Sequence, residues 1–431
     1  MTDRKKGMQE LLKFFVPLGI TWSLMMFTHT IISAGLSRTT NPTVSTAAYA
    51  VALSLAAIAE APLVMLRQTV MANVSSKQTF LVVRAVALTT LAFFAAVVLS
   101  IAYVPAIGRL AFQQILGVKD ELFSATVLAF RVTMFLPLVS GLRCLYQGLI
   151  TQQRRTKYLS TGMFIRVGFM IFLVFGFTRW RWVVGPLVGA IALVGGIGVE
   201  GLMAYYFGRN LVPEGDATLV SNDVWKFYLP LVASSLLVAM GKPFINAGLA
   251  RMPDAAVGLA AFNVASSLAW VIVSPSQTMH QVTMVCGRSV ADRPVVRHFA
   301  TIFAVGSTLL LMALAYSPIG RWVLGGLISV PTESLPATLN ALRTLAFFPL
   351  IICWQEYNTG LLLLDRSTRL VSIGKALNLA STIGFVIFLA PTLPGAIAAP
   401  LAQLVGFTCE GIVLHGGRLW LAKRWPAPSV S

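Results

Sequence analysis

Ionisable side chains inside long apolar stretches are the residues of this sequence best suited to chemistry. A charge at the centre of a bilayer costs about 2.5–3.5 kcal/mol on insertion scales, so each such residue needs a partner or a wet cavity. Basic residues outnumber acidic ones among them. They are His29, Glu60, Arg131, Arg143, Arg166, Glu200, Lys242, Arg343, Glu356, Lys375 and Glu410. We expect this set to bind or relay charge.

One of these stretches is unusually polar midway along its length. Residues 354–360 read WQEYNTG and combine amide, carboxylate, hydroxyl and aromatic groups. Groups of this kind orient a ligand in an otherwise apolar pocket. We therefore expect Gln355, Glu356 and Asn358 to contact a ligand if this stretch faces a cavity.

A subset of the intramembrane residues is predicted to bind an anion. Lys242, with Arg143 and Arg343, would attract the anion, and Glu356 would tune or relay charge. The predicted substrate-binding residues are Lys242, Arg143, Glu356, His29, Arg343, Gln355 and Asn358. The alternatives are ion pairing within one half of the chain and, for Arg343, snorkelling to the headgroups near the end of its stretch.

Two further pairs of charges are predicted to be structural. Arg166 and Glu200 lie at similar depth in neighbouring apolar runs, and Lys375 and Glu410 repeat that arrangement in the second half. A buried charge is tolerated when an opposite charge and hydrogen bonds accompany it. We expect one ion pair in each half of the chain.

The composition places these residues in an all-α, polytopic membrane protein. The chain is 57% hydrophobic and 11% charged, against about 45–50% and about 25% for soluble domains. Apolar runs of about 20 residues are long enough to cross a hydrocarbon core roughly 30 Å thick. The twelve predicted spans are 13–36, 44–66, 81–104, 123–149, 158–178, 183–207, 226–249, 256–280, 299–325, 336–364, 371–393 and 395–417.

The sequence is internally duplicated. A shift of 213 residues pairs Pro17 with Pro230, and a shift of 212 pairs Arg154 with Arg366. Matches this long in one register indicate two copies of one unit. Because each copy has an even number of spans, the copies are parallel repeats, as in carriers that rock two bundles about a central cleft. The predicted parts are a lobe at 1–208, a cytoplasmic linker at 209–225, a second lobe at 226–417 and a basic tail at 418–431.

Four prolines repeat between the two copies near one end of their spans. They are Pro17, Pro62, Pro230 and Pro275. Proline bends a helix or ends its regular bonding, so these positions are predicted bending points. The alternative is an ordinary kink with no role in a conformational cycle.

The net charge of +18 is distributed as in a membrane protein. Basic residues concentrate on the side of the twelve spans that holds both termini. The positive-inside rule therefore predicts cytoplasmic termini in a cell membrane, and it removes the need to invoke nucleic acid as a partner.

Motifs for catalysis are absent from the sequence. There is no G-x-x-x-x-G-K-[ST], no H-E-x-x-H and no G-x-S-x-G, and the four cysteines show no C-x-x-C spacing. We predict that the protein is not an enzyme and holds no cofactor or metal. A polyprenyl-group transferase would need clustered aspartates for magnesium and diphosphate, and no predicted span contains an aspartate.

A duplicated unit of six spans opening with F-x-x-P-L resembles the multidrug/oligosaccharidyl-lipid/polysaccharide (MOP) exporter superfamily, which includes the MATE exporters. Residues 15–21, 242–246 and 342–349 look most like its progressive ankylosis (ANK) branch. The resemblance implies a secondary transporter or flippase with alternating access. The first span lacks the ion-coupling aspartate of many MATE exporters.

The resemblance leaves the substrate open. Members of the ANK branch export small organic anions, whereas other branches flip polyprenyl-linked glycans, and both substrates suit a basic cleft. A structural membrane protein without transport is a distant alternative, because it would have no need for buried charges such as Lys242 and Glu356. The coupling ion and the direction of transport stay undetermined.

Overall fold

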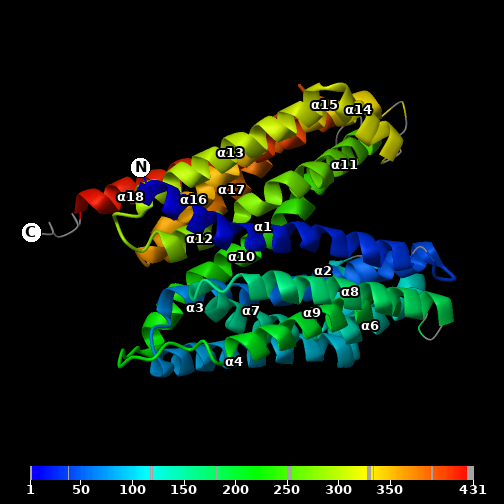
Figure 1. The fold of residues 1–431 in the computed structure, drawn as a ribbon. Coiled ribbons are helices and arrows are strands. Elements are labelled where there is room, and N and C mark those ends of the chain that lie inside the picture. Colours follow the sequence, from blue (N-terminus) through cyan, green and yellow to red (C-terminus); the bar gives the residue numbers. More distant parts are fainter. Residues whose placement is uncertain are drawn as a thin grey trace, which may run out of the picture. The chain divides into compact units, whose positions relative to one another are not determined.

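The computed structural model describes residues 2–36, 38–116, 118, 120–180, 183, 185–249, 255–327, 332, 334–389 and 392–424. All regular structure in these residues is helical, which confirms the predicted all-α class (Figure 1). The helices of the first half are α1 (Thr2–Leu36), α2 (Pro42–Val64), α3 (Leu66–Asn73), α4 (Lys77–Tyr103), α5 (Pro105–Arg109), η1 (Leu110–Ile115), α6 (Asp120–Thr133), α7 (Leu136–Gln152), α8 (Lys157–Trp180) and α9 (Leu187–Gly208). Those of the second half are α10 (Ser221–Leu249), α11 (Ala255–Val273), η2 (Ser274–Thr278), α12 (Met279–Cys286), α13 (Arg293–Tyr316), α14 (Pro318–Trp322), η3 (Val323–Leu327), α15 (Leu335–Leu345), α16 (Phe348–Leu364), α17 (Thr368–Leu389) and α18 (Gly395–Arg424).

Ten helical segments of the described chain are long and apolar enough to cross a membrane. They coincide with ten of the twelve predicted spans. The other two predictions, 226–249 and 256–280, fall on α10 and on the run from α11 to α12, which include residues whose side chains lie outside the description. The protein is therefore a multi-pass membrane protein, and twelve spans stays a prediction.

Two predicted spans extend further than the sequence suggested. The second continues through α3 to Asn73, and the run that begins with α11 continues through α12 to Cys286. Each is interrupted next to its proline: α2 ends two residues after Pro62, and Pro275 lies in the short 3-10 turn η2. The sequence prediction ended each span too early. Polar residues follow each interruption, although the helix resumes after it.

The chain forms two compact units whose boundaries lie inside helices. Unit 1 comprises Met1–Gly19 and Leu237–Ser431, and unit 2 comprises Ile20–Leu236. The first boundary divides α1 and the second divides α10, so each of these helices belongs to both units. The units thus differ from the predicted lobes, because each sequence repeat contributes the beginning of its first helix to the unit formed mainly by the other repeat.

Aromatic contacts show what these contributed segments do. Phe15 of α1 packs edge-on against Phe299 and Phe303 of α13, with ring centroids 5.1 and 4.6 Å apart. In unit 2, the buried Tyr228 of α10 donates a hydrogen bond to the carbonyl of Pro62 at 2.9 Å. Phe15 and Tyr228 are equivalent at the shift of 213, so the exchange follows the repeat.

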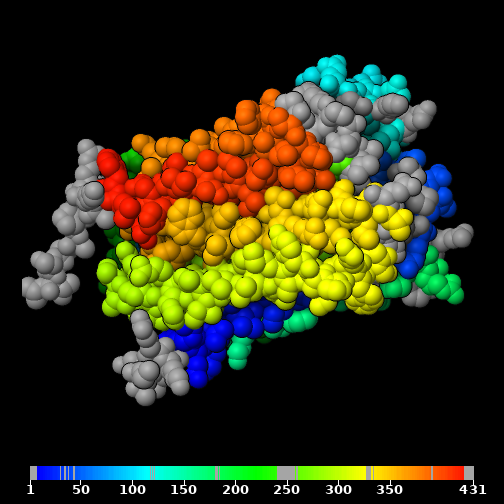
Figure 2. Space-filling view, turned by 90° about the horizontal axis from the view of Figure 1, so that it is seen from above, coloured from blue at the N-terminus to red at the C-terminus, as the bar shows by residue number. Residues whose placement is uncertain are grey.

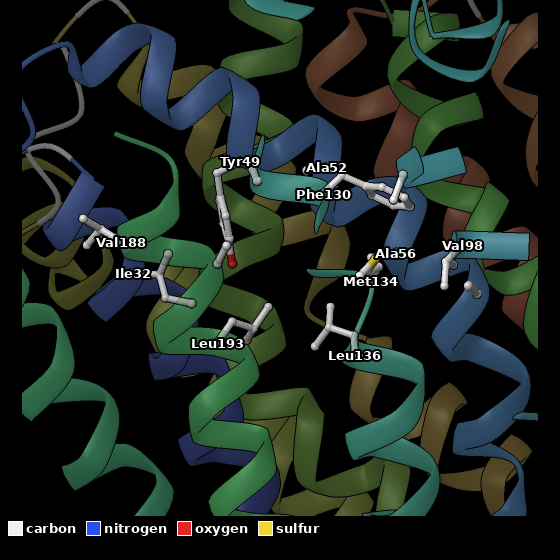
Figure 3. Close-up of a cluster of buried hydrophobic side chains, with 14 of the residues drawn as sticks. Ile32, Tyr49, Ala52, Ala56, Val98, Phe130, Met134, Leu136, Val188 and Leu193 are labelled. Atoms are coloured by element: carbon white, nitrogen blue, oxygen red, sulfur yellow. The ribbon is translucent and has the colours of Figure 1, made fainter. Parts of the chain in front are cut away.

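Unit 2 is packed around small and aromatic side chains of α2. Ala52 and Ala56 are fully buried, which lets neighbouring helices approach closely. Figure 3 shows Tyr49 beside Ile32 of α1 and Leu193 of α9. Burial of these groups, at about 25 cal/mol per Å² of apolar surface, is what holds the polar residues described below in place.

Unit 1 has a core of its own on α11, α13, α15 and α16. Phe348 lies 6.2 Å from Trp270 and 5.7 Å from Phe407, both edge-on, at the centre of a buried cluster. Figure 2 shows α13, α16, α17 and α18 of this unit side by side, coloured from yellow-green to red.

A short irregular segment follows the third span of each repeat. α5 continues into the π-helical turn η1, and α14 continues into η3. Gly108 and Gly320 occupy equivalent positions there, and a Cβ on either would collide with the carbonyl oxygen of Ile101 or Leu314. Glycine is required because the backbone approaches the preceding helix so closely. The two repeats therefore share the conformation of this irregular segment as well as their long helices.

Candidate functional site

A buried group of charges lies in unit 2, and we call it the arginine cluster. Its members are Arg67 of α3, Arg143 of α7, Arg166 of α8, Glu60 of α2 and Glu200 of α9. Five helices therefore meet at one polar site inside an apolar bundle. Charges buried in this way persist only when opposite charges and hydrogen bonds compensate their lost hydration.

Glu200 is the centre of the arginine cluster. Its Oε2 atom accepts hydrogen bonds from Arg166 at 2.9 Å and from Arg143 at 3.2 Å. Its other oxygen, Oε1, accepts one from the amide of Gln147 at 2.8 Å. All three side chains and Glu200 itself are buried. The carboxylate is held by two guanidiniums and one amide, which fixes α7, α8 and α9 relative to one another.

Two residues extend the arginine cluster at its edges. Arg67 donates to the Oε1 atom of Gln147, so this amide links Arg67 to Glu200. Glu60 accepts a hydrogen bond from the hydroxyl of Ser140 and lies 3.7 Å from Arg143. Arg143 thus lies between two carboxylates.

The arginine cluster carries more positive than negative charge. Three arginines meet two glutamates, which leaves an excess of one positive charge. The Nε atoms of Arg67, Arg143 and Arg166 are buried and have no hydrogen-bond partner among the described residues. Buried donors are normally paired, so unpaired guanidinium N–H groups are a feature that a stability role alone does not explain.

Unit 1 holds a second group of charges, which we call the carboxylate cluster. Its members are Glu356 of α16, Glu410 of α18, Lys375 of α17 and His280 of α12. Lys375 contacts the fully buried Glu410 at 2.7 Å. The amides of Gln355 and Asn378 donate to the two oxygens of Glu410 at 2.6 and 2.7 Å.

The predicted polar stretch of α16 divides between this cluster and its surroundings. Glu356 lies 2.6 Å from Nδ1 of His280. Asn358 lies two residues further along, and its Oδ1 atom is 3.3 Å from Nδ1 of His415. Gln355, Glu356 and Asn358 therefore all contact polar side chains of their own unit.

The two clusters occupy equivalent positions of the repeat. Glu200 corresponds to Glu410, and Arg143 corresponds to Gln355, so the same carboxylate accepts a guanidinium in unit 2 and an amide in unit 1. At the shift of 212, Arg166 corresponds to Asn378, one turn beyond Lys375. Both donate to the equivalent glutamate.

The predicted ion-pair partners meet in each unit. Arg166 contacts Glu200, and Lys375 contacts Glu410. The structure differs from the expectation in one respect: Lys375 does not occupy the repeat position of Arg166, which Asn378 takes. Whether the pairs are only structural stays a prediction.

The remaining predicted residues lie elsewhere. Arg343 stacks over Tyr316 at 5.5 Å and donates to Asn340 at 3.2 Å. Its repeat counterpart Arg131 stacks over Tyr103 at 5.3 Å, which is the arrangement expected of an anchor. His29 is exposed.

Lys242 falls within α10, but its side chain lies outside the described part of the structure. Its predicted role is therefore carried forward as a proposal. Arg143 is buried between Glu60 and Glu200, and its predicted role in attracting an anion stays a prediction.

Sequence reasoning missed Arg67 and His280. Arg67 lies just beyond the predicted end of its span at residue 66, and His280 is the last residue of its predicted span; the helices α3 and α12 continue past both residues. The signal was present in the repeat, because the register that pairs Gln68 with Gln281 also pairs Arg67 with His280. Within the described residues, no three His, Cys, Asp or Glu side chains form a group that could hold a metal ion.

Comparison with known proteins supports the resemblance predicted from the sequence. A MATE transporter in complex with MaL6 matches with a TM-score of 0.77 and 16% identity over 97% of both chains. A MOP superfamily transporter from Pyrococcus furiosus, described as having a binding pocket of reverse polarity, matches with a TM-score of 0.75 and 17% identity over 97% of both chains. An outward-facing MATE family transporter matches with a TM-score of 0.73 and 16% identity over 97% of this chain and 96% of the other. Residues 217–402 match the family model of the progressive ankylosis protein (ANKH). The chain thus has the fold of MATE transporters of the MOP superfamily, and its second half is similar to the ANK branch.

Proposed function

We propose that this protein is a secondary transporter or flippase that moves an anionic or amphipathic substrate across a membrane by alternating access. The observation that carries the proposal is the arginine cluster, with three guanidiniums, two carboxylates and three unpaired Nε–H groups inside an apolar bundle. A protein that only needed stability would gain as much from apolar packing at these positions. An excess buried charge favours a partner of opposite sign.

The fold supports a mechanism in which the two units change orientation. α1 and α10 belong to both units, so any such movement must pass through these two helices. Pro17 lies two residues before the boundary in α1, and Pro230 lies six residues before the boundary in α10. Proline weakens the helical hydrogen-bond ladder, which lowers the cost of bending there. The matched MATE structure in an outward-facing state supports such a cycle for this fold.

The mechanism is tested by labelling single cysteines from each side of reconstituted vesicles. Cys144, Cys286 and Cys353 are buried, and the partly exposed Cys409 is replaced by serine to keep background labelling low. Positions near Pro17 and Pro230 should change reactivity when substrate is added. Reactivity from one side only, under every condition, would contradict alternating access.

The substrate class is tested by transport in proteoliposomes. Uptake of a panel of radiolabelled small carboxylates and organic phosphates measures export of a small anion. Loss of a fluorescent, polyprenyl-linked glycan from the outer leaflet measures flipping. The variant Arg67→Gln removes the excess charge, and we expect it to reduce transport at least about tenfold, the effect of one interaction of about 1.4 kcal/mol. Arg369→Gln removes an exposed charge and should change nothing; equal transport by both variants would refute the role of the cluster.

Small-anion export is the form of the proposal that the second half of the chain favours. Residues 217–402 match the family model of the progressive ankylosis protein (ANKH), and the resemblance of the sequence to the ANK branch implies export of a small organic anion. We carry Lys242 forward as a further residue that attracts the anion. Lys242→Gln keeps the side-chain volume and removes the charge, so unaltered transport by this variant would end its assignment.

The membrane placement completes the proposal. Both termini are cytoplasmic in a cell membrane, two parallel repeats form the carrier, and residues 209–225 link them on the cytoplasmic side. The excess of basic residues on that side supports this orientation. Protease protection of a terminal epitope tag in sealed cells measures it directly.

A further inference from the structure

A basic and aromatic pocket lies at one end of the unit 2 bundle, away from the arginine cluster. Its volume is about 320 Å³, and it is lined by Arg155, Tyr158, Tyr206, Phe207, Arg209, Asn210 and Leu211. These residues come from the turn after α7, the start of α8 and the end of α9. The volume is at the lower end of the range for small-molecule sites.

The turn after α7 is what places Arg155 at this pocket. The N–H of Arg155 bonds the carbonyl of Ile150 at 2.9 Å, and the N–H of Arg154 bonds that of Thr151 at 3.0 Å. This is a Schellman end, in which the residue after the helix takes a left-handed conformation. Arg154 does so with φ of 56°, a position that glycine usually holds. The chain then reverses, and Arg155 precedes α8.

Aromatic rings form the wall of the pocket. Tyr158 stacks flat on Phe207, with centroids 4.4 Å apart and planes 6° apart. Arg209 lies over the rings of Tyr205 and Tyr206 at 5.9 and 5.6 Å. These contacts hold the guanidinium in position without neutralising it.

Neither guanidinium at the pocket has an acidic partner in the part of the chain that the structure describes. In the described residues, no ion pair includes Arg155 or Arg209, although Glu214 and Asp216 follow a few residues later in the chain. Both arginines are exposed, and Asn210, the residue after Arg209, adds an amide to the pocket lining. Paired guanidiniums suit the oxygens of a phosphate group, which accept several hydrogen bonds at once.

The second repeat shows that the fold does not need these residues. The same Schellman turn recurs at Arg366, whose φ is 55°, and is followed by Ser367 where the first repeat has Arg155. Leu370 stands at the position of Tyr158. Gly416 and Gly417 stand at the positions of Tyr206 and Phe207, and a Cβ on Gly417 would meet Leu370 at 2.9 Å.

We propose that this pocket binds a phosphate group through Arg155 and Arg209, with the aromatic wall covering the rest of the ligand. Two sources supply such a group at the end of a transmembrane bundle: the headgroup of an anionic phospholipid and a soluble phosphate compound. Tyrosine and arginine at helix ends lie at the level of lipid headgroups, so the lipid is the source that the position favours. The proposal is independent of the transported substrate.

The test measures lipid binding by the full-length protein in detergent, using native mass spectrometry. Phosphatidylglycerol is titrated into the wild type and into the double variant Arg155→Ser/Arg209→Gln. Arg155→Ser introduces the residue that the second repeat already tolerates in the same turn. We expect binding to weaken about tenfold or more, because each basic residue contributes separately to attraction of an anionic headgroup. The matched control is Arg366→Gln/Arg369→Gln, which removes two charges at the equivalent turn of unit 1 and should bind lipid as the wild type does.

A second arm separates the two sources of phosphate. Thermal unfolding is recorded in inorganic phosphate and in chloride at equal ionic strength. A phosphate-specific shift that the double variant loses, without any difference in lipid binding, supports a soluble ligand. Tyr158→Leu, which copies Leu370, should weaken binding of either ligand less than the double variant does. If wild type, control and double variant bind phosphatidylglycerol equally and show the same phosphate shift, the proposal is overturned.

Discussion

The arginine cluster of unit 2 and the carboxylate cluster of unit 1 are built on equivalent helices but differ in charge. Each has one buried glutamate, Glu200 or Glu410, that accepts hydrogen bonds from three side chains. In unit 2 two of these donors are guanidiniums and one is an amide. In unit 1 two are amides and one is an ammonium. Both units therefore keep the acceptor glutamate, whereas the donors around it differ. The local charge differs with the donors.

The same exchange of chemistry occurs one turn away. Tyr146 meets Tyr205 in an edge-on aromatic contact, with centroids 5.0 Å apart. The equivalent residues of unit 1 are Asn358 and His415, which form a polar contact instead. Contacts between the helices are kept in both units while their polarity differs. This is the behaviour expected where an asymmetric ligand or a coupling ion is handled.

The largest expected effect comes from removing the acceptor glutamate from each cluster. Glu200→Gln leaves Arg143 and Arg166 buried beside a neutral amide. Removing one partner of a buried ion pair costs about 3–5 kcal/mol, so we expect a loss of stability of that size. Chemical denaturation in detergent, followed by circular dichroism, measures it.

The matched variant in unit 1 is Glu410→Gln. It strands Lys375 and leaves one of the two amide donors facing an NH2 group, but only one buried cation loses its carboxylate instead of two, so the loss should be smaller. Equal losses in the two variants would mean that the clusters do not differ in the way their charges imply.

A milder substitution makes the arginine cluster of unit 2 more like the carboxylate cluster of unit 1. Arg143→Gln introduces the residue that its repeat counterpart Gln355 already supplies. The charge-assisted bond to Glu200 is lost while Arg166 remains, so we expect a loss of about 1.5–3 kcal/mol. Anion transport in proteoliposomes should fall together with the excess charge. A variant as unstable as Glu200→Gln would show that Arg143, and not the glutamate, organises the site.

The fold was largely predictable from the sequence, because hydropathy and duplication are properties of long segments. Ten predicted spans, the repeat and the resemblance to MATE-like proteins all depend on many residues at once. The exchange of helix beginnings between units was not predictable, because Phe15 and Tyr228 look alike in either arrangement. Only the contacts with Phe299 and Pro62 decide it.

The site was predicted in part. The glutamates Glu200 and Glu410 and their basic partners were found, since charges in apolar runs are conspicuous. Arg67 was missed because a proline-induced break ended its predicted span before the helix itself ended. His280 was missed because it is the last residue of its predicted span and was not counted among the intramembrane charges. The direction of a side chain could not be predicted from the sequence either. Only the structure shows that Arg143 lies between two carboxylates, so that its charge is paired.

A third prediction concerns the His280–Glu356 pair, which unit 2 does not have. His280 and Glu356 lie 2.6 Å apart, and their repeat counterparts are Arg67 and Cys144. A double-mutant cycle with His280→Gln and Glu356→Gln should give a coupling energy of about 0.5–3 kcal/mol, as residues in one network do. Unfolding of the four proteins in denaturant measures it. Additive losses would mean that the pair does not act as a unit.

The smallest expected effect lies at the exchanged beginning of α10. The variant Tyr228→Phe removes one hydroxyl, which donates to the carbonyl of Pro62 at 2.9 Å. A hydrogen bond of this kind contributes about 0.5–1.5 kcal/mol, and the carbonyl keeps its bond from the N–H of Met65, so the loss should lie at the lower end.

The matched control for this change is Tyr49→Phe in the same unit. The hydroxyl of Tyr49 is buried and has no hydrogen-bond partner among the described residues, so its removal should be neutral or stabilising. Both variants keep the ring and its packing, and denaturant unfolding compares them directly. If Tyr228→Phe is as neutral as Tyr49→Phe, the contact at Pro62 contributes nothing to holding α10 on unit 2. The aromatic and apolar packing of α10 would then account for the exchange alone.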